Sequence, residues 1–307
     1  MRVLAHIHTF NDADIIDGTI AAVLRQTRPV DGILVVDNAS TDGTLEQPSI
    51  KQATVLRHAE NRGTSGAIIT GFGYALEHDY DWIWVFDADS VPEPDALEKL
   101  LDLYAGWPQS QQDETGFLAC LYHNLGNGLP KHGGIFTPHG IDEVTPQPGV
   151  PYYPCHFVIW SGCLYRLAAV REIGLPNPDY VLDWGEIEYG QRVMQAGYKG
   201  YVDQDAILHH NIRGYLTLTE IEVTRGSETF KMLEFPPIRC YYGCRNPIYF
   251  LLYEIGQGNR RLLLKMVRNV MMLPLNLVRR PRNHGKQIVA CCRGLWHGVT
   301  GNIAARY

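Results

Sequence analysis

The run from Trp82 to Asp89 constrains the fold most strongly, because five large apolar residues are followed there by Asp87-Ala88-Asp89. Apolar residues without polar alternation are typical of a short strand buried on both faces of a parallel sheet. Asp87 and Asp89 lie on the same side of an extended segment, since side chains two residues apart share a face. At the carboxyl end of a central strand they would occupy the edge where open α/β sheets bind ligands. Two carboxylates held this close predict a divalent-cation site, although both could instead face water in a loop.

Strands and helices alternate along the first part of the chain. The predicted strands cover residues 3–9, 33–36, 54–56 and 82–86. Apolar residues at helical spacing predict helices over 15–24 and 67–78. This alternation predicts an α/β fold whose mainly parallel central sheet is flanked by helices. Polar residues follow the first, second and fourth strands, so we expect these strand ends to line one crevice.

Two common nucleotide-binding classes are disfavoured by the glycine pattern. The sequence contains no Gly-x-x-x-x-Gly-Lys, which argues against a P-loop NTPase. Its glycine-rich segment, residues 60–66, follows the third predicted strand rather than the first and does not read Gly-x-Gly-x-x-Gly. A Rossmann dehydrogenase is therefore disfavoured as well.

Composition places the chain among globular, intracellular proteins. Its residues are 45% apolar and 20% charged, as in globular proteins. A length of 307 residues is enough for one large α/β domain or a domain with an appendage. Seven cysteines without metal-ligand spacing indicate a reducing compartment. No signal-peptide pattern precedes the first predicted strand, and no run of about 20 apolar residues is present. We therefore expect a cytoplasmic protein.

Charge is strongly segregated along the chain. Residues 255–307 contain ten Lys or Arg and no Asp or Glu, whereas residues 1–254 contain 17 basic and 33 acidic residues. A basic tail mixed with Leu, Val and Met predicts amphipathic helices at an anionic membrane surface. The alternative is a basic helical pair packed on the acidic body. Nucleic-acid binding is not expected, because neither an aromatic single-strand platform nor a groove-reading motif is recognisable.

Four short motifs in this order resemble those of a known enzyme family. They are Thr9-Phe10-Asn11, the stretch from Val35 to Gly43, Asn61-Arg62-Gly63 and Asp87-Ala88-Asp89. Together they resemble the family 2 glycosyltransferases, over residues 1 to about 215. The resemblance implies the GT-A fold, a nucleoside-diphosphate-sugar donor, an Mg²⁺ or Mn²⁺ ion, and inversion at the anomeric carbon.

The resemblance also implies roles for the polar residues at the strand ends. The residues expected on the donor nucleotide are Thr9, Asn11, Asp37, Asn38, Asn61, Gly63 and Asp87. Asp37 is also explained as a turn-forming residue, because Asp-Asn-x-Ser favours turns. Asp89, with Asp87 beside it, would hold the metal against the diphosphate. The strand-like stretch 200–210 resembles the family's strand that ends in a histidine, so we predict His209 as a third metal ligand, with His210 left open by the ambiguous register.

The acceptor side is expected to contain a general base. In Asp183-Trp184-Gly185-Glu186-Ile187-Glu188, Glu186 matches the family's base and Asp183 is the reserve candidate. Such a carboxylate would remove the proton from the attacking acceptor hydroxyl. Two departures stand out: Gly185 replaces the first acid of the family's pair, and the base is Glu rather than Asp. Glu186 is alternatively a partner of the helix dipole.

Further residues are predicted to bind the acceptor or the donor phosphates. Trp160, Trp184 and Glu188 are expected near the acceptor, although Trp160 could equally fill the core. The stretch 241–247 resembles a segment of rhamnosyl- and galactofuranosyl-transferring members. Within it, Arg245 is predicted either to reach the donor phosphates or to cap a helix at the surface.

These observations predict a catalytic domain over residues 1–215, divided at about residue 106 into a nucleotide-binding part and an acceptor part. A connecting helical segment is expected over 216–254 and basic amphipathic helices over 255–307. We expect an inverting transferase that uses dTDP-rhamnose or a UDP-hexose or UDP-galactofuranose and acts on a glycan or lipid-linked glycan of the cell surface, at the inner face of the membrane. The rival interpretations are a sugar-1-phosphate nucleotidyltransferase and a non-catalytic glycan- or membrane-binding relic of the fold.

Overall fold

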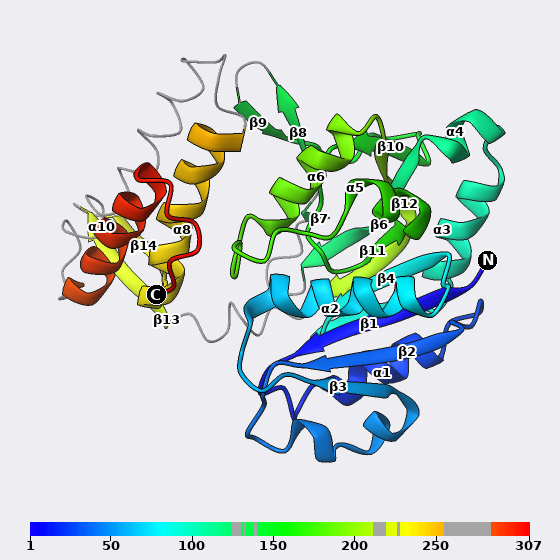
Figure 1. Ribbon diagram of the computed structural model, residues 1–307, viewed down its shortest axis with the longest axis horizontal. Helices are drawn as coiled ribbons and strands as arrows, with labels where there is room; N and C mark the ends of the chain where they lie inside the picture. The colour runs from blue at the N-terminus through cyan, green and yellow to red at the C-terminus, as the bar shows by residue number, and fades with distance from the viewer. Residues whose placement is uncertain (125–129, 132, 138–139, 211–218, 226–227, 255–283) are drawn as a thin grey trace. The chain divides into compact units, whose positions relative to one another are not determined.

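The computed structural model describes the chain except for residues 125–129, 132, 138–139, 211–218, 226–227 and 255–283 (Figure 1). The chain divides into two compact units, which are described separately here. The first unit comprises residues 1–136, 142–178 and 186–212, and the second comprises residues 137–141, 179–185 and 213–307.

A mixed β-sheet is the centre of the first unit. In sheet order its strands are β10 (Tyr152–Cys155), β12 (Lys199–His210), β6 (Thr115–Asn124), β11 (Cys163–Arg166), β4 (Trp82–Asp87), β1 (Val3–Thr9), β2 (Gly32–Asp37) and β3 (Thr54–Arg57). The strands β4, β1, β2 and β3 run parallel, while β11 pairs antiparallel with both β4 and β6. The predicted α/β fold with a mainly parallel sheet is confirmed.

Two short strands pair with β12 and β6 and so extend this sheet. β5 (Ser90–Pro92) pairs antiparallel with the end of β12, and β7 (Pro130–Lys131) pairs with β6. The segment between β6 and β10 also contains β8 (Gly134–Thr137) and β9 (Gly140–Glu143).

Helices cover both faces of the sheet. The helices along this part of the chain are α1 (Ile16–Leu24), α2 (Gly63–Glu77), α3 (Ala96–Ala105), α4 (Gln109–Asp113), α5 (Leu167–Ile173) and α6 (Gly185–Gln195), with 3₁₀ turns η1 (Thr44–Glu46) and η2 (Pro48–Gln52). Apolar residues of α1 and α3 pack on one face, and those of α2, α5 and α6 pack on the other. The sheet is therefore the middle of three layers.

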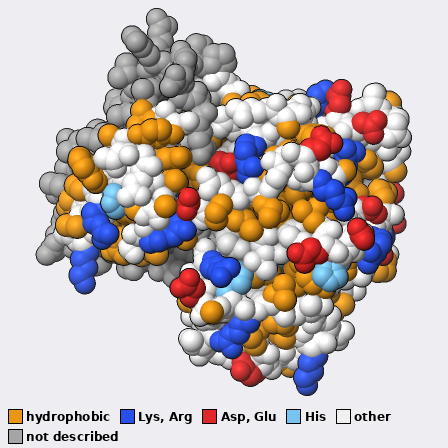
Figure 2. Space-filling view, viewed as in Figure 1, with side chains coloured by type: hydrophobic (Ala, Val, Ile, Leu, Met, Phe, Trp, Pro, Cys, Tyr) orange, Lys and Arg blue, Asp and Glu red, His pale blue; other side chains and the backbone are white. Residues whose placement is uncertain are grey.

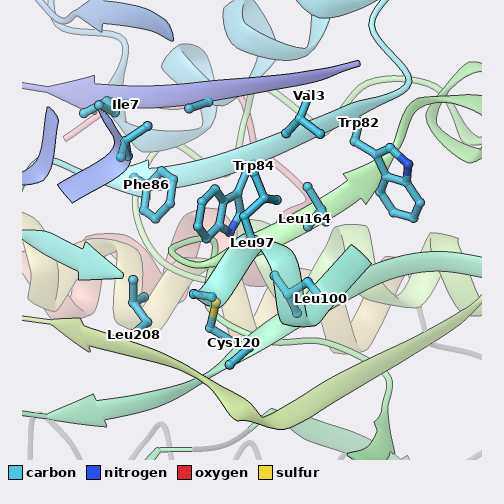
Figure 3. Packing of buried hydrophobic residues seen from close by; sticks show 14 of the residues in the cluster. Val3, Ile7, Trp82, Trp84, Phe86, Leu97, Leu100, Cys120, Leu164 and Leu208 are labelled. Atoms are coloured by element: carbon cyan, nitrogen blue, oxygen red, sulfur yellow. The ribbon is translucent and has the colours of Figure 1, made fainter. Parts of the chain in front are cut away.

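The β4 strand is buried on both faces, as its unbroken apolar sequence predicts. Trp84 and Phe86 point into the layer of α1 and α3, where Figure 3 shows them beside Leu97 of α3. Ile83 and Val85 point into the opposite layer. All four side chains are fully buried, so β4 is fixed from both sides. The turn that follows it therefore starts from a rigid support.

The second unit differs in part from the predicted helical segment over 216–254. An antiparallel pair, β13 (Thr219–Arg225) and β14 (Glu228–Glu234), occupies its first half, where a helix was expected; cross-strand pairing replaces it. Its second half is helical as predicted, with α8 (Pro237–Tyr249) and the π-helical turn η3 (Phe250–Glu254). Of the predicted C-terminal helices, α10 (Gly285–Val299) is described, and residues 255–283 lie outside the described part. Among the described helices, none has the length and apolar character needed to cross a membrane.

Helices α8 and α10 approach closely because the buried face of α10 carries small residues. Ala290, Gly294 and Gly298 recur at every fourth position and are all buried against α8. A Cβ atom added at Gly294 would lie 2.3 Å from the backbone oxygen of Tyr241, and one at Gly298 would lie 2.7 Å from that of Arg245. Both positions therefore need glycine because the backbones of α8 and α10 lie so close together, and not because the chain turns there.

We expect Gly294→Ala to destabilise the protein by about 1–3 kcal/mol, because the added methyl group meets backbone that cannot move aside cheaply. The matched control is Gly243→Ala on α8, where an added Cβ meets nothing within 4 Å. That change should be neutral or stabilising by up to about 1 kcal/mol, through helix propensity. Urea unfolding followed by circular dichroism measures both, and equal effects of the two substitutions would contradict this packing.

Candidate active site

The turn Asp87-Ala88-Asp89 at the end of β4 is held by hydrogen bonds from helix α1 and from the segment before β11. The backbone N–H of Asp87 donates to Oγ of Ser161 over 3.1 Å. The carbonyl of Ala88 accepts a 2.6 Å hydrogen bond from Oγ1 of Thr19 on α1. Thr19 and Ser161 are both buried, so they fix the backbone of the turn and with it the directions of the two carboxylate side chains.

Asp87, Asp89 and His210 form a cluster with metal-ligand composition. One ligand atom from each lies within 4.8 Å of the others. Nδ1 of His210 is 3.3 Å from Oδ1 of Asp89, and its Nε2 is 3.8 Å from Oδ2 of Asp87. The side chain of Asp87 is 34% exposed, compared with 11% for Asp89 and 13% for His210. The cluster is thus reachable from solvent mainly at Asp87.

The structure brings His210, and not the predicted His209, to the aspartates. In the antiparallel pair of β5 and β12, His210 lies opposite Ser90 and His209 lies opposite Val91. Neighbouring side chains on a strand point to opposite faces, so only one of the two histidines can reach the turn. Nε2 of His209 instead lies 2.6 Å from a carboxylate oxygen of Glu93.

Three polar residues that sequence analysis did not single out surround the cluster. Nε2 of His8 lies 2.6 Å from Oδ1 of Asp87. Oγ of Ser90 lies 2.6 Å from Oγ of Ser161 and 2.7 Å from Nδ1 of His210. Ser90 and Ser161 therefore connect the backbone of the turn to the imidazole. Sequence alone does not single out Ser161, because its place beside the turn depends on the pairing of β11 with β4.

The loops after β1 and β2 are joined at the same edge of the sheet. The hydroxyl of Thr9 donates to Oδ2 of Asp12 over 2.8 Å. Asn11 has a positive φ of 59°, a conformation that Asn tolerates; its N–H donates to Ser40, and its side-chain oxygen accepts the N–H of Thr41. In the strand register Thr9 lies beside Asp37, as the predicted convergence of strand ends requires.

The other residues predicted on the nucleotide side lie in this same loop system. The fully buried carboxylate of Asp37 accepts the N–H of Ser40 and pairs with Nε of Arg57 at 3.2 Å. The side-chain nitrogen of Asn38 donates to the carbonyl of Gly63, and the side-chain oxygen of Asn61 accepts the N–H of Gly63. All six of these predicted residues thus lie at the ends of β1 and β2 and at the start of α2.

The predicted acceptor residues divide between solvent-reachable and core positions. Glu186 is half-buried in the first turn of α6. Glu188 is buried and forms an ion pair with Nε of Arg192 at 2.6 Å; burial raises the pKa of its carboxyl, and Arg192 opposes that rise. Trp160 is 5% exposed among the aromatic rings of Phe72, Tyr165 and Tyr189. The structure thus places Glu188 and Trp160 in the core rather than at an acceptor surface.

Asp183 and Trp184 form a strained pair just before α6. Both have left-handed backbone conformations, with φ of 59° and 72°, which are uncommon for residues other than glycine. Burial raises the pKa of Asp183, and the nearby Arg239 partly offsets the rise. The ring of Trp184 lies 5.6 Å from that of Phe250.

The side chain of Arg245 is fully buried, and each of its three nitrogens donates a hydrogen bond within the second unit. Its guanidinium donates to the carbonyls of Asp179 and Ala305 and to the side chain of Asn246. Burial lowers its pKa. Each of its three nitrogens already has a partner, so the prediction that Arg245 reaches the donor phosphates or caps a helix at the surface is wrong for this structure.

The chain is similar to named glycosyltransferases of bacteria, of which two are described here. An undecaprenyl-phosphate mannosyltransferase of Micrococcus luteus is 38% identical over 110 residues, which cover 33% of this chain and 44% of the relative. A galactofuranosyltransferase of Mycobacterium tuberculosis is 24% identical over 203 residues, which cover 64% of this chain and 65% of the relative. The match therefore spans less than two thirds of either relative.

A solved structure and a family model agree with this similarity. The mannosyltransferase of Pyrobaculum calidifontis in complex with GDP-Man and Mn²⁺ has a TM-score of 0.54 and 15% identity, over 97% of this chain and 75% of the other. This likeness, with the mixed sheet flanked by helices, confirms the predicted GT-A fold. The model described as glycosyl transferase family 2 matches residues 5–174, more than half of the sequence. The chain belongs to glycosyl transferase family 2.

Proposed function

We propose that this chain is a metal-dependent, inverting glycosyltransferase that moves a sugar from a nucleoside-diphosphate donor to a hydroxyl of a lipid-linked glycan. The observation that carries the proposal is the Asp87, Asp89 and His210 cluster, which lies at the same sheet edge as the loops after β1 and β2. A site for a cation beside a site for a nucleoside is what a donor with a diphosphate between base and sugar requires.

The residues of the cluster fit a divalent cation. Two carboxylates and one imidazole form a mixed oxygen and nitrogen ligand set, which suits Mn²⁺ and, less well, Mg²⁺. When bound, such an ion would neutralise charge on the leaving diphosphate. His8 and Ser90 bond to members of the cluster, as outer partners of metal ligands commonly do. The likeness to a structure that contains GDP-Man and Mn²⁺ supports the same assignment.

The donor nucleoside would lie against the loops that contain Thr9, Asn11, Asp37, Asn38 and Asn61, with Gly63 at the start of α2. Their side chains already fix these loops to one another, so the surface presented to the nucleoside is preorganised. The named relatives act with mannosyl and galactofuranosyl groups, which supports a sugar donor of this kind. The acceptor would be a polyprenyl-linked glycan of cell-wall synthesis, made at a membrane surface.

Glu186 would act as the general base, with Asp183 in reserve. An inverting transfer needs a carboxylate that takes the proton of the acceptor hydroxyl as it attacks the anomeric carbon. Glu186 is half-buried at the start of α6, whereas Glu188 two residues later is already used by Arg192. Trp184, next to this segment, would contact the acceptor.

The donor class is tested by calorimetric titration of the full chain with UDP, dTDP and GDP, each with and without Mn²⁺. We expect one nucleotide to bind in the presence of Mn²⁺ and its affinity to fall at least tenfold in Asp89→Asn, because one charged metal ligand is lost. Equal nucleotide affinity with and without Mn²⁺ would contradict the proposed role of the cation in donor binding. No binding of any nucleotide would overturn the transferase itself.

Ser161→Ala should weaken Mn²⁺ binding by about 10–100-fold, because the turn loses the hydroxyl that links Asp87 to Ser90. The readout is the free Mn²⁺ signal in electron paramagnetic resonance, measured with the preferred nucleotide present. Ser161→Thr retains the hydroxyl and should recover most of the affinity. An unchanged Mn²⁺ affinity in Ser161→Ala, at unchanged thermal stability, would show that the hydroxyl does not position the ligands.

Glu186→Gln should lower kcat by about 10²–10⁴-fold while leaving nucleotide affinity unchanged, because the amide cannot accept the acceptor proton. The exposed Glu77 at the end of α2 supplies the matched control, and Glu77→Gln should retain full activity. The assay measures sugar transfer to a polyprenyl-diphosphate-linked glycan. If Asp183→Asn abolishes transfer and Glu186→Gln does not, the base is Asp183.

A further inference from the structure

The outer face of α10 carries a row of exposed apolar side chains. The row consists of Val289, Cys292, Trp296 and Val299, at successive spacings of three, four and three residues. Val289 is 59% exposed, Trp296 67% and Val299 55%, and Cys292 is also exposed. Spacings of this kind place the four side chains along one side of a helix. The opposite side holds Ala290, Gly294 and Gly298 against α8, so the row lies on the side of α10 that faces away from α8.

Basic side chains flank this row, and acidic ones are absent from the helix. Lys286 and Arg293 are exposed and, being seven residues apart, lie on one side of α10 next to the apolar row. The helix contains no Asp or Glu, and neither does any other part of residues 255–307. Figure 2 shows Lys and Arg side chains beside hydrophobic ones over the region of α8 and α10. An exposed indole next to basic residues is the composition of a helix lying in a membrane interface.

We propose that the outer face of α10 docks on an anionic lipid bilayer. Trp296 and the two valines would enter the boundary between headgroups and acyl chains, while Lys286 and Arg293 would contact the anionic headgroups. The helix of 15 residues is about 22 Å long, enough to lie along the surface over several lipid headgroups. The charge favours this occupant over a second copy, because two such faces would bring only like charges together.

Membrane binding by this face of α10 would support the proposed function, but it can be measured without any measurement of catalysis. An enzyme whose acceptor is linked to a polyprenyl chain must work at a membrane, so this inference rests on the proposed function for its purpose. Vesicle binding needs neither donor nor metal. A failure of docking and a failure of catalysis are therefore separate results.

The test is flotation of the full chain with vesicles of phosphatidylcholine alone or with about 30% phosphatidylglycerol. We expect binding to the anionic vesicles only, reduced about tenfold or more by Lys286→Glu and similarly by Trp296→Ser. Leu24→Ser, at an exposed apolar residue of α1 in the first unit, should bind like the unmodified chain. Circular dichroism and nucleotide titration of each variant verify that the fold and the donor site are intact.

Three results would overturn the proposal. The first is no binding to anionic vesicles. The second is binding that neither Lys286→Glu nor Trp296→Ser weakens, which would assign membrane contact to other parts of the chain. The third is a dimer in sedimentation equilibrium, lost in Trp296→Ser and accompanied by no vesicle binding, which would identify a second copy as the occupant.

Discussion

The candidate site depends on holding two carboxylates together at the end of one strand. Asp87 and Asp89 repel each other when both are ionised, and a short turn offers no way to separate them. In the structure the imidazoles of His8 and His210 lie against the two carboxylates, and Oγ of Ser161 accepts the backbone N–H of Asp87 in the turn. β4 supports the arrangement because it is packed from both layers. A buried strand, and not the loop itself, therefore fixes where the charges are.

Local patterns in the sequence predict the half of the site that depends on strand ends. An unbroken apolar run predicts a doubly buried strand, and parallel strands place their carboxyl ends together, so Thr9, Asp37 and Asp87 could be assigned to one edge. The register between distant strands is not encoded locally. His210 lies at the cluster only because β12 pairs with β5 so that His210 meets Ser90, and a shift of one residue would have brought His209 instead.

Two charged residues predicted at the site are paired inside the protein instead. Glu188 reads as a site acid, but Arg192 one turn later and the N–H of Asn177 use its carboxylate. Arg245 reads as a phosphate ligand, but carbonyls about 60 residues away on either side enclose its guanidinium. A buried charge must be paired, and only the folded chain shows with what.

Arg245 and its neighbour Asn246 on α8 have a structural role in place of the predicted contact with donor phosphates. Arg245 donates to the carbonyl of Asp179, and its neighbour Asn246 donates to the carbonyls of Leu182 and Asp183. Two consecutive residues of α8 thus form hydrogen bonds to the backbone of the segment that ends in the strained pair Asp183 and Trp184. Left-handed backbone at such residues costs on the order of 1–3 kcal/mol each and persists only where surrounding contacts impose it. Hydrogen bonds from α8 therefore impose the backbone of residues 183 and 184, which directly precede Glu186 in the sequence.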